Sequence, residues 1–377
     1  MIQAARTHSR VLTPLFLALA LAAPAIAQQE KDVVRLKDGK SESGKIKSED
    51  YGGLVITVGK EEKTIAWNDI LPEGGITYAG PGSVQYQSAK EIVDQGKLED
   101  AAAALTELKG EKQLRAVLKQ NVLYYLGYVQ QRQSKLDEAL GTYKELLTEF
   151  PKSRYLMMVG ENLVTIHLAK KDVAGAMKAL DQLSADAAGA GVECGFGASV
   201  SVLKGRVLEE QKKYPEAQAQ YVVAEKSAGV APSVVAQAVL GQGRCAVAMN
   251  KKPEAEGLFR KLVTQDGPNV VVAGAWNGLG DLMFEEGKPK AAGSKGDPER
   301  ILDALYCYLR DVVQYAPLPG EPTTEYERSL ALASDCFKWL ATLETKADMK
   351  VEYKKRSDAR LEQLKSQFPN SPFREGR

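Results

Sequence analysis

The chain has 377 residues, of which 44% are hydrophobic and 26% are charged, as in ordinary globular proteins. This length exceeds that of one typical domain, so we expect more than one domain. The formal net charge is +1, so the composition provides neither the basic field of a nucleic-acid binder nor the acidic excess of a cation buffer. We therefore expect no nucleic-acid partner.

The first 27 residues have the pattern of a secretory signal peptide. Arg6 and Arg10 give a positive start, residues 11–22 are mainly apolar, and Ala25-Ile26-Ala27 is a small-x-small cleavage site. We predict a mature chain that begins at Gln28 and acts in the periplasm or outside the cell. An uncleaved anchor helix is the alternative, although the uncharged stretch reaches only the short limit of a membrane span. No later stretch is apolar enough to span a bilayer.

Residues 28–80 are predicted to form a small all-β domain. Apolar and polar residues alternate from Val34, Asp38-Gly39 is a turn signal, and residues 54–58 are a β-branched apolar run. About five short strands in this region fit a small barrel. The pattern Val34-Arg35-Leu36-Lys37-Asp38-Gly39, followed by Gly44 and Ile46, resembles the SH3-like or Sm-like barrels that begin some exported bacterial repeat proteins. The short linker that follows, Ala-Gly-Pro-Gly-Ser, predicts that the barrel lies close to the first helices.

One segment of this region matches a phosphate-binding loop over seven positions, from Gly39 to Lys45. The eighth position is Ile46, where a hydroxyl should hold magnesium, and β-alternation follows instead of the required helix. We therefore expect no nucleotide there and no cofactor elsewhere.

A helical-hairpin pattern recurs roughly every 38 residues from about Gln85 onward, which is the period of a solenoid of stacked helix pairs. A small residue opens each second helix: Ala101, Ala139, Ala176, Ala217, Ala255 and Ala304. A large apolar residue follows four positions later: Leu105, Tyr143, Leu180, Tyr221, Phe259 and Tyr308. Each first helix carries a position that is mostly small: Ala89, Gly127, Val164, Gly205, Gly243 and Gly280.

Residues 84–377 resemble tetratricopeptide repeats. The second repeat is the clearest, with Leu123, Leu126 and Gly127 on its first helix, Ala139, Tyr143 and Leu146 on its second, and Pro151 after it. The resemblance implies a mainly α fold, a solenoid of about six to seven helix pairs preceded by the small β-barrel. After Glu321 the pattern weakens, and two longer helices, about Glu325–Leu343 and Ala347–Phe368, are predicted to form a terminal pair.

Catalytic chemistry has little support in the sequence. After the predicted cleavage one histidine remains, His167, and it stands at a core-type position, so it cannot build a triad or a His-rich metal site. We expect no catalytic residue and no metal. A two-carboxylate glycosidase is the enzyme alternative, because any two acids can meet across a groove.

The four cysteines are widely spaced, with no C-x-x-C among them: Cys194, Cys245, Cys307 and Cys336. The last three lie in apolar helical stretches, which favours buried free thiols. A Cys307–Cys336 disulfide is the alternative in an oxidising compartment.

The resemblance implies that the first helices line a concave face. The positions expected to face this groove are Tyr124, Tyr128, Glu161, Arg206, Arg244, Asn277 and Asp281. Arg206 and Arg244 hold equivalent positions in adjacent repeats, and Tyr124 and Tyr128 lie one turn apart. Such a groove suits an extended peptide or a carboxylate-bearing segment. These residues are ordinary exposed side chains in the alternative interpretation.

Together these patterns predict a non-catalytic protein-binding scaffold or adaptor of the bacterial cell envelope. Its partner would be an envelope protein that the sequence does not name. A module that binds cell-wall glycan or peptide is the alternative, since groove tyrosines can stack on sugars. An enzyme is the third class.

Overall fold

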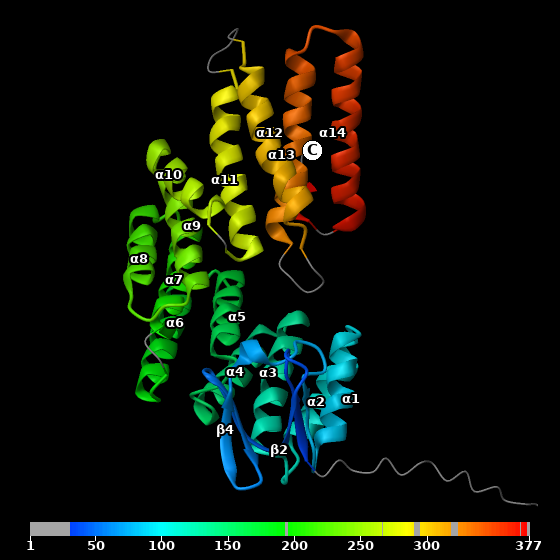
Figure 1. The fold of residues 1–377 in the computed structure, drawn as a ribbon, viewed down its shortest axis with the longest axis vertical. Coiled ribbons are helices and arrows are strands. Elements are labelled where there is room, and N and C mark those ends of the chain that lie inside the picture. The colour runs from blue at the N-terminus through cyan, green and yellow to red at the C-terminus, as the bar shows by residue number, and fades with distance from the viewer. Residues whose placement is uncertain are drawn as a thin grey trace, which may run out of the picture.

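The computed structural model describes residues 31–192, 195–265, 267–289, 295–317, 323–369 and 371–374. The predicted signal peptide and Cys194 lie outside the described residues. Within them, a small antiparallel sheet is followed by an array of α-helices (Figure 1). The predicted mainly α solenoid preceded by a small all-β region is confirmed. The closure of that sheet into an SH3-like or Sm-like barrel stays a prediction.

The sheet has five strands in the order β4-β3-β2-β1-β5, with antiparallel neighbours. The strands are β1 Asp32–Arg35, β2 Ser41–Asp50, β3 Gly53–Val58, β4 Glu61–Ile65 and β5 Ile76–Thr77. Strand β2 carries a register shift between Ile46 and Ser48, which bends it, and a short 3₁₀ turn joins β4 to β5. The phosphate-loop look-alike begins in the β1–β2 turn, and strand β2 follows that turn instead of a helix.

The helices form seven consecutive pairs. These are α1 Ser83–Asp94 with α2 Leu98–Lys109, α3 Ala116–Arg132 with α4 Leu136–Glu149, α5 Leu156–Ala169 with α6 Val173–Gly189, α7 Gly195–Glu210 with α8 Tyr214–Lys226, α9 Pro232–Ala248 with α10 Lys252–Val263, α11 Asn269–Gly287 with α12 Pro298–Gln314, and α13 Thr324–Leu343 with α14 Ala347–Gln367. The last pair matches the predicted terminal helices to within one residue at each end.

Each first helix packs against the first helix of the next pair, from α1 through α13. Figure 1 shows α5, α7 and α9 on the inner side of an arc, with α6, α8 and α10 outside them. The turn within each of the first five pairs contains one residue with a left-handed backbone: Gly96, Ser134, Lys171, Lys212 and Asn250. This shared turn geometry keeps the pairs alike and so keeps the first helices on one face.

Small positions of the first helices lie against large aromatic positions of the second helices. A Cβ placed on Gly127 would lie 2.6 Å from a ring carbon of Tyr143, whose side chain is fully buried. The same geometry recurs in three later pairs: Gly205 with Tyr221, Gly243 with Phe259 and Gly280 with Tyr308. The missing side chain lets the two helices of a pair approach until the aromatic ring touches backbone.

The sheet and the first helices share one hydrophobic core, which includes Val34 and Ile56 of the sheet and Leu118 of α3. A buried ion pair fixes the contact: the Arg115 guanidinium donates to both carboxylate oxygens of Asp32, each at 2.7 Å. The sheet therefore lies close to the first helices, as the short linker predicted. The division of the chain into separate domains at residue 80 stays a prediction.

The cysteines and the histidine have structural roles among the described residues. Three thiols are free and buried, and burial raises the pKa of each: Cys245, Cys307 and Cys336. The alternative Cys307–Cys336 bridge is not formed. His167 lies 3.0 Å from the carboxylate of Asp172, the residue that caps the start of α6, so its imidazole is satisfied locally.

Candidate partner-binding face

The inner face is partly covered by the sheet. Glu49 of β2 is buried, and its carboxylate accepts hydrogen bonds from Tyr78 and from the amide of Asn121 on α3, and pairs with Arg154 at 3.3 Å. The side-chain amide of Gln120 donates to the backbone carbonyl of Glu49 at 3.1 Å. This stretch of α3 is therefore occupied by the chain itself.

The two predicted groove tyrosines lie just beyond this contact. Tyr124 stacks on Tyr155 with ring centroids 4.0 Å apart and planes 4° apart, and burial raises its pKa to about 12. Tyr128 accepts a hydrogen bond from Arg132, whose guanidinium also lies over its ring. One face of Tyr124 is thus already covered, which leaves less aromatic surface for a sugar than the sequence suggested.

A row of charged side chains runs across α5, α7 and α9. Glu161 on α5 and Arg206 on α7 lie 3.9 Å apart, and both side chains are more than half exposed, at 53% and 54%. Arg244 on α9 is 42% exposed and pairs with Glu325 of α13. Glu209 lies among them: burial raises the pKa of its carboxyl, while the charges of Arg244 and Arg206 oppose that shift. The structure thus brings Arg206 and Arg244 to one charged surface.

The placement expected for Asn277 is corrected by the structure. Its side chain is 0% exposed, and its amide donates to Asp311 at 3.3 Å and to the Glu325 carboxylate at 3.0 Å. The side-chain oxygen of Asn277 accepts a hydrogen bond from Ser329. Asn277 cannot reach a partner because α13 packs over it.

Asp281, one turn further along α11, is also engaged within the protein. Its carboxylate accepts the Tyr308 hydroxyl at 2.8 Å and pairs with Arg328 of α13. Its side chain remains 27% exposed. Of these two partners, Tyr308 stands at a repeat position that the sequence analysis identified, whereas Arg328 belongs to the terminal pair, where the repeat pattern weakens.

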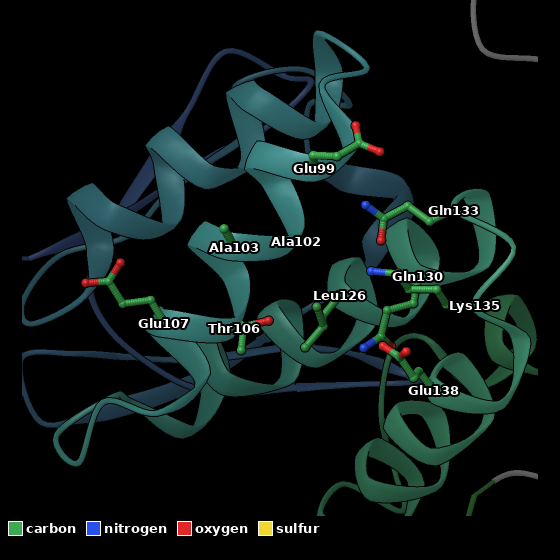
Figure 2. Close-up of a pocket in the computed structure, with 10 residues that line it drawn as sticks. All are labelled: Glu99, Ala102, Ala103, Thr106, Glu107, Leu126, Gln130, Gln133, Lys135 and Glu138. Carbon is green, nitrogen blue, oxygen red and sulfur yellow. The ribbon is translucent and has the colours of Figure 1, made fainter.

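A second surface, which the sequence did not indicate, lies between α2 and α4 (Figure 2). The hollow has a volume of about 580 Å³. Figure 2 shows the side chains that line it, with Leu126 lying between Glu107 on one side and Gln130 and Glu138 on the other. Its lining residues are Glu99, Ala102, Ala103, Thr106, Glu107, Leu126, Gln130, Gln133, Lys135 and Glu138. The mixed charges around this hollow do not converge on one ligand chemistry.

Among the described residues, neither surface carries a cluster of metal-ligating side chains. In the part of the chain that the structure describes, no three histidine, cysteine or acidic side chains gather closely enough to hold a metal ion. Within the same residues, no helix combines the length and the apolar composition that crossing a membrane requires.

Tetratricopeptide-repeat family models match residues 121–153 and residues 202–271. These segments cover α3 with α4, and most of the stretch from α7 to the start of α11. The chain contains tetratricopeptide repeats. Tyr124 and Tyr128 lie in the first matched segment, and Arg206 and Arg244 lie in the second. No curated protein matches the chain.

Several solved structures are similar to the array at low identity. A tetratricopeptide repeat protein from Parabacteroides merdae is 18% identical, with a TM-score of 0.41 over 73% of this chain and 98% of its own. PilW, a type IV pilus biogenesis factor, is 15% identical, with a TM-score of 0.43 over 68% and 96%. PilF of Pseudomonas aeruginosa is 18% identical, with a TM-score of 0.40 over 68% and 95%.

Proposed function

We propose that this protein is a non-catalytic scaffold of the bacterial cell envelope that binds a protein segment along the inner face of α5, α7 and α9. The observation that carries the proposal is the exposed charge pair Glu161–Arg206, with Arg244 on the next first helix. An ion pair this exposed contributes little to stability, so both charges are available to a partner at little cost. Charges of this kind steer association and set register more than they add affinity.

Three further points support the proposal. Arg206 and Arg244 of the charged row lie in the segment that matches tetratricopeptide repeats, whose general role is to bind other proteins. The pattern of residues 1–27 supports export and hence a role in the envelope. The strand order β4-β3-β2-β1-β5 is compatible with a small SH3-like barrel, which would act beside the repeats as a second contact.

The test is crosslinking and affinity capture from cells with the full chain and two single variants. Arg206→Glu reverses one charge of the inner row and places it against Glu161. Arg260→Glu is the matched control, because this arginine is equally exposed, at 59%, but lies on the outer helix α10. We expect an envelope protein that is captured by the parent and by Arg260→Glu and is lost with Arg206→Glu. Capture that is equal in all three would refute the assignment of this face.

A further inference from the structure

A small pocket lies where the start of α11, the end of α12 and the start of α13 meet. Its volume is about 270 Å³, which is below the roughly 300–1,000 Å³ of pockets for drug-sized ligands. Apolar and aromatic surface comes from Val270, Ala273, Tyr315 and Tyr326, and acidic groups come from Asp311 and Glu325. A pocket of this size admits one side chain or one small molecule.

Asp311 has an unused hydrogen-bonding position in this pocket. Its side chain is 0% exposed, and one carboxylate oxygen, Oδ2, accepts hydrogen bonds from Asn277 and from Ser329. The other oxygen, Oδ1, has no hydrogen-bond partner among the described residues. Buried carboxylate oxygens are normally paired, so an unpaired one on a residue that lines a pocket marks a place where a donor would be gained.

The charges around Asp311 leave the pocket acidic. Glu325 faces it from α13, with one oxygen bound by Arg244 of α9 and the other accepting the Asn277 amide. Arg328, which follows Glu325 on α13, forms its ion pair with Asp281. Burial raises the pKa of Asp311 to about 6, with Glu325 adding to the shift and Arg328 opposing it. The side chains of Asp311 and Glu325 therefore meet here, and Arg244, the cation that contacts Glu325 among the described residues, is already engaged in that ion pair.

We propose that this pocket binds a single alkylammonium or guanidinium group. The cation would donate to Asp311 Oδ1, and its aliphatic stem would lie against Val270 and the two tyrosine rings. Charge-assisted hydrogen bonds of this kind are short and strong, and aromatic rings also attract cations. The group would come from a basic side chain of a protein partner or from a free amine. The proposal is independent of the charged row on α5, α7 and α9, because Arg206 has no part in it.

The test measures binding of small probes to the full chain by isothermal titration calorimetry at pH 7.5. The probes are agmatine and n-butylamine as free amines, N-acetyl-lysine and N-acetyl-arginine methylamides as side-chain mimics, and N-acetyl-norleucine methylamide as the uncharged control. We expect the charged probes to bind and the norleucine probe to bind at least about tenfold more weakly. Comparable affinity for free amines and side-chain mimics would identify a small-amine site, and preference for the mimics a partner's side chain.

Two variants and one control locate the site. Asp311→Asn keeps the shape of the side chain and removes its charge, so we expect affinity for the charged probes to fall at least about tenfold. Asp303→Asn is the control, because it makes the same change at an exposed position of the same helix, and we expect no effect. Val270→Trp, at a position 38% exposed, would fill the pocket without disturbing Asp311 and should abolish binding even if Asp311→Asn fails to fold. The proposal is overturned if the charged probes do not bind, or bind Val270→Trp as well as the parent.

Discussion

The recurring glycine–aromatic contact predicts that one substitution has opposite effects at two nearby positions. Gly127 of α3 faces the buried ring of Tyr143, and an added Cβ would lie 2.6 Å from it. Gly141 of α4 is exposed, with nothing within 4 Å of an added Cβ. We consider the substitution of alanine for glycine at each of these two positions, which lie in the same helix pair.

The expected magnitudes follow from two opposing terms. Replacing a helical glycine by alanine stabilises by about 1 kcal/mol, because alanine loses less backbone entropy on folding. Gly141→Ala should therefore raise the free energy of unfolding by about 0.5–1 kcal/mol. At Gly127 the new methyl group overpacks a ring that is 0% exposed, at a cost of about 1–3 kcal/mol. The net effect of Gly127→Ala is then a loss of up to about 2 kcal/mol.

The assay is urea unfolding followed by circular dichroism, with hydrogen exchange over α3 and α4 as a local measure, because repeat arrays can unfold in parts. A third variant, Gly127→Ala with Tyr143→Leu, gives the new methyl group room, so the two substitutions should show a favourable coupling in a double-mutant cycle. Stabilisation of the same size by both Gly→Ala substitutions would refute the close-approach argument.

Three further predictions concern buried groups. Arg115→Met leaves the Asp32 carboxylate buried without its ion-pair partner, so we expect a loss of about 3–5 kcal/mol and faster cleavage near Gly80–Ser83 by a protease of broad specificity, whereas Lys119→Met, at an exposed pair, should change stability by less than about 1 kcal/mol. Burial raises the pKa of Asp311 from its ordinary value of 3.8 to about 6, so the folded state holds more protons between these values and stability falls as pH rises from about 4 to 7. Asp311→Asn should remove up to about 3 kcal/mol of this pH dependence, measured by urea unfolding of the parent and of the variant across the pH range. The same pH dependence in both proteins would contradict the raised pKa of Asp311. A thiol reagent should modify three cysteines only on unfolding, since burial raises the pKa of each thiol: Cys245, Cys307 and Cys336.

The sequence was sufficient for features that repeat or that depend on neighbours along the chain. The period of about 38 residues placed Gly127 opposite Tyr143, and alternation located the strands, because each pattern reflects a local geometry that the residues themselves impose. The same local rules predicted α13 and α14 almost to the residue. Periodicity carries this information because every repeat must bury the same face.

Periodicity and local alternation could not predict contacts between segments that are distant in the sequence. Asn277 stands at a position that faces solvent in an average repeat, but α13 supplies Ser329 and Glu325 to cover it. Asp311 gave no signal at all, because its carboxylate becomes unusual only when α11, α12 and α13 meet around it. These features depend on how the terminal pair closes the array, and one sequence contains no pattern for that closure.

The sheet has a mechanical consequence for the inner face. It contacts α3 through Glu49, reaches the α4–α5 turn through Arg154, and touches α7 where Tyr51 meets Phe196 edge-to-face at 5.1 Å. The sheet thus contacts helices of repeats that are not neighbours, α3 and α7, although each repeat of a solenoid ordinarily contacts only its neighbours. We expect these contacts to restrain α5 and α7 relative to one another, and so to limit the change in the spacing of Glu161 and Arg206 on binding. A preorganised surface loses less entropy on binding, so under the proposed function the sheet would contribute to affinity without touching the partner.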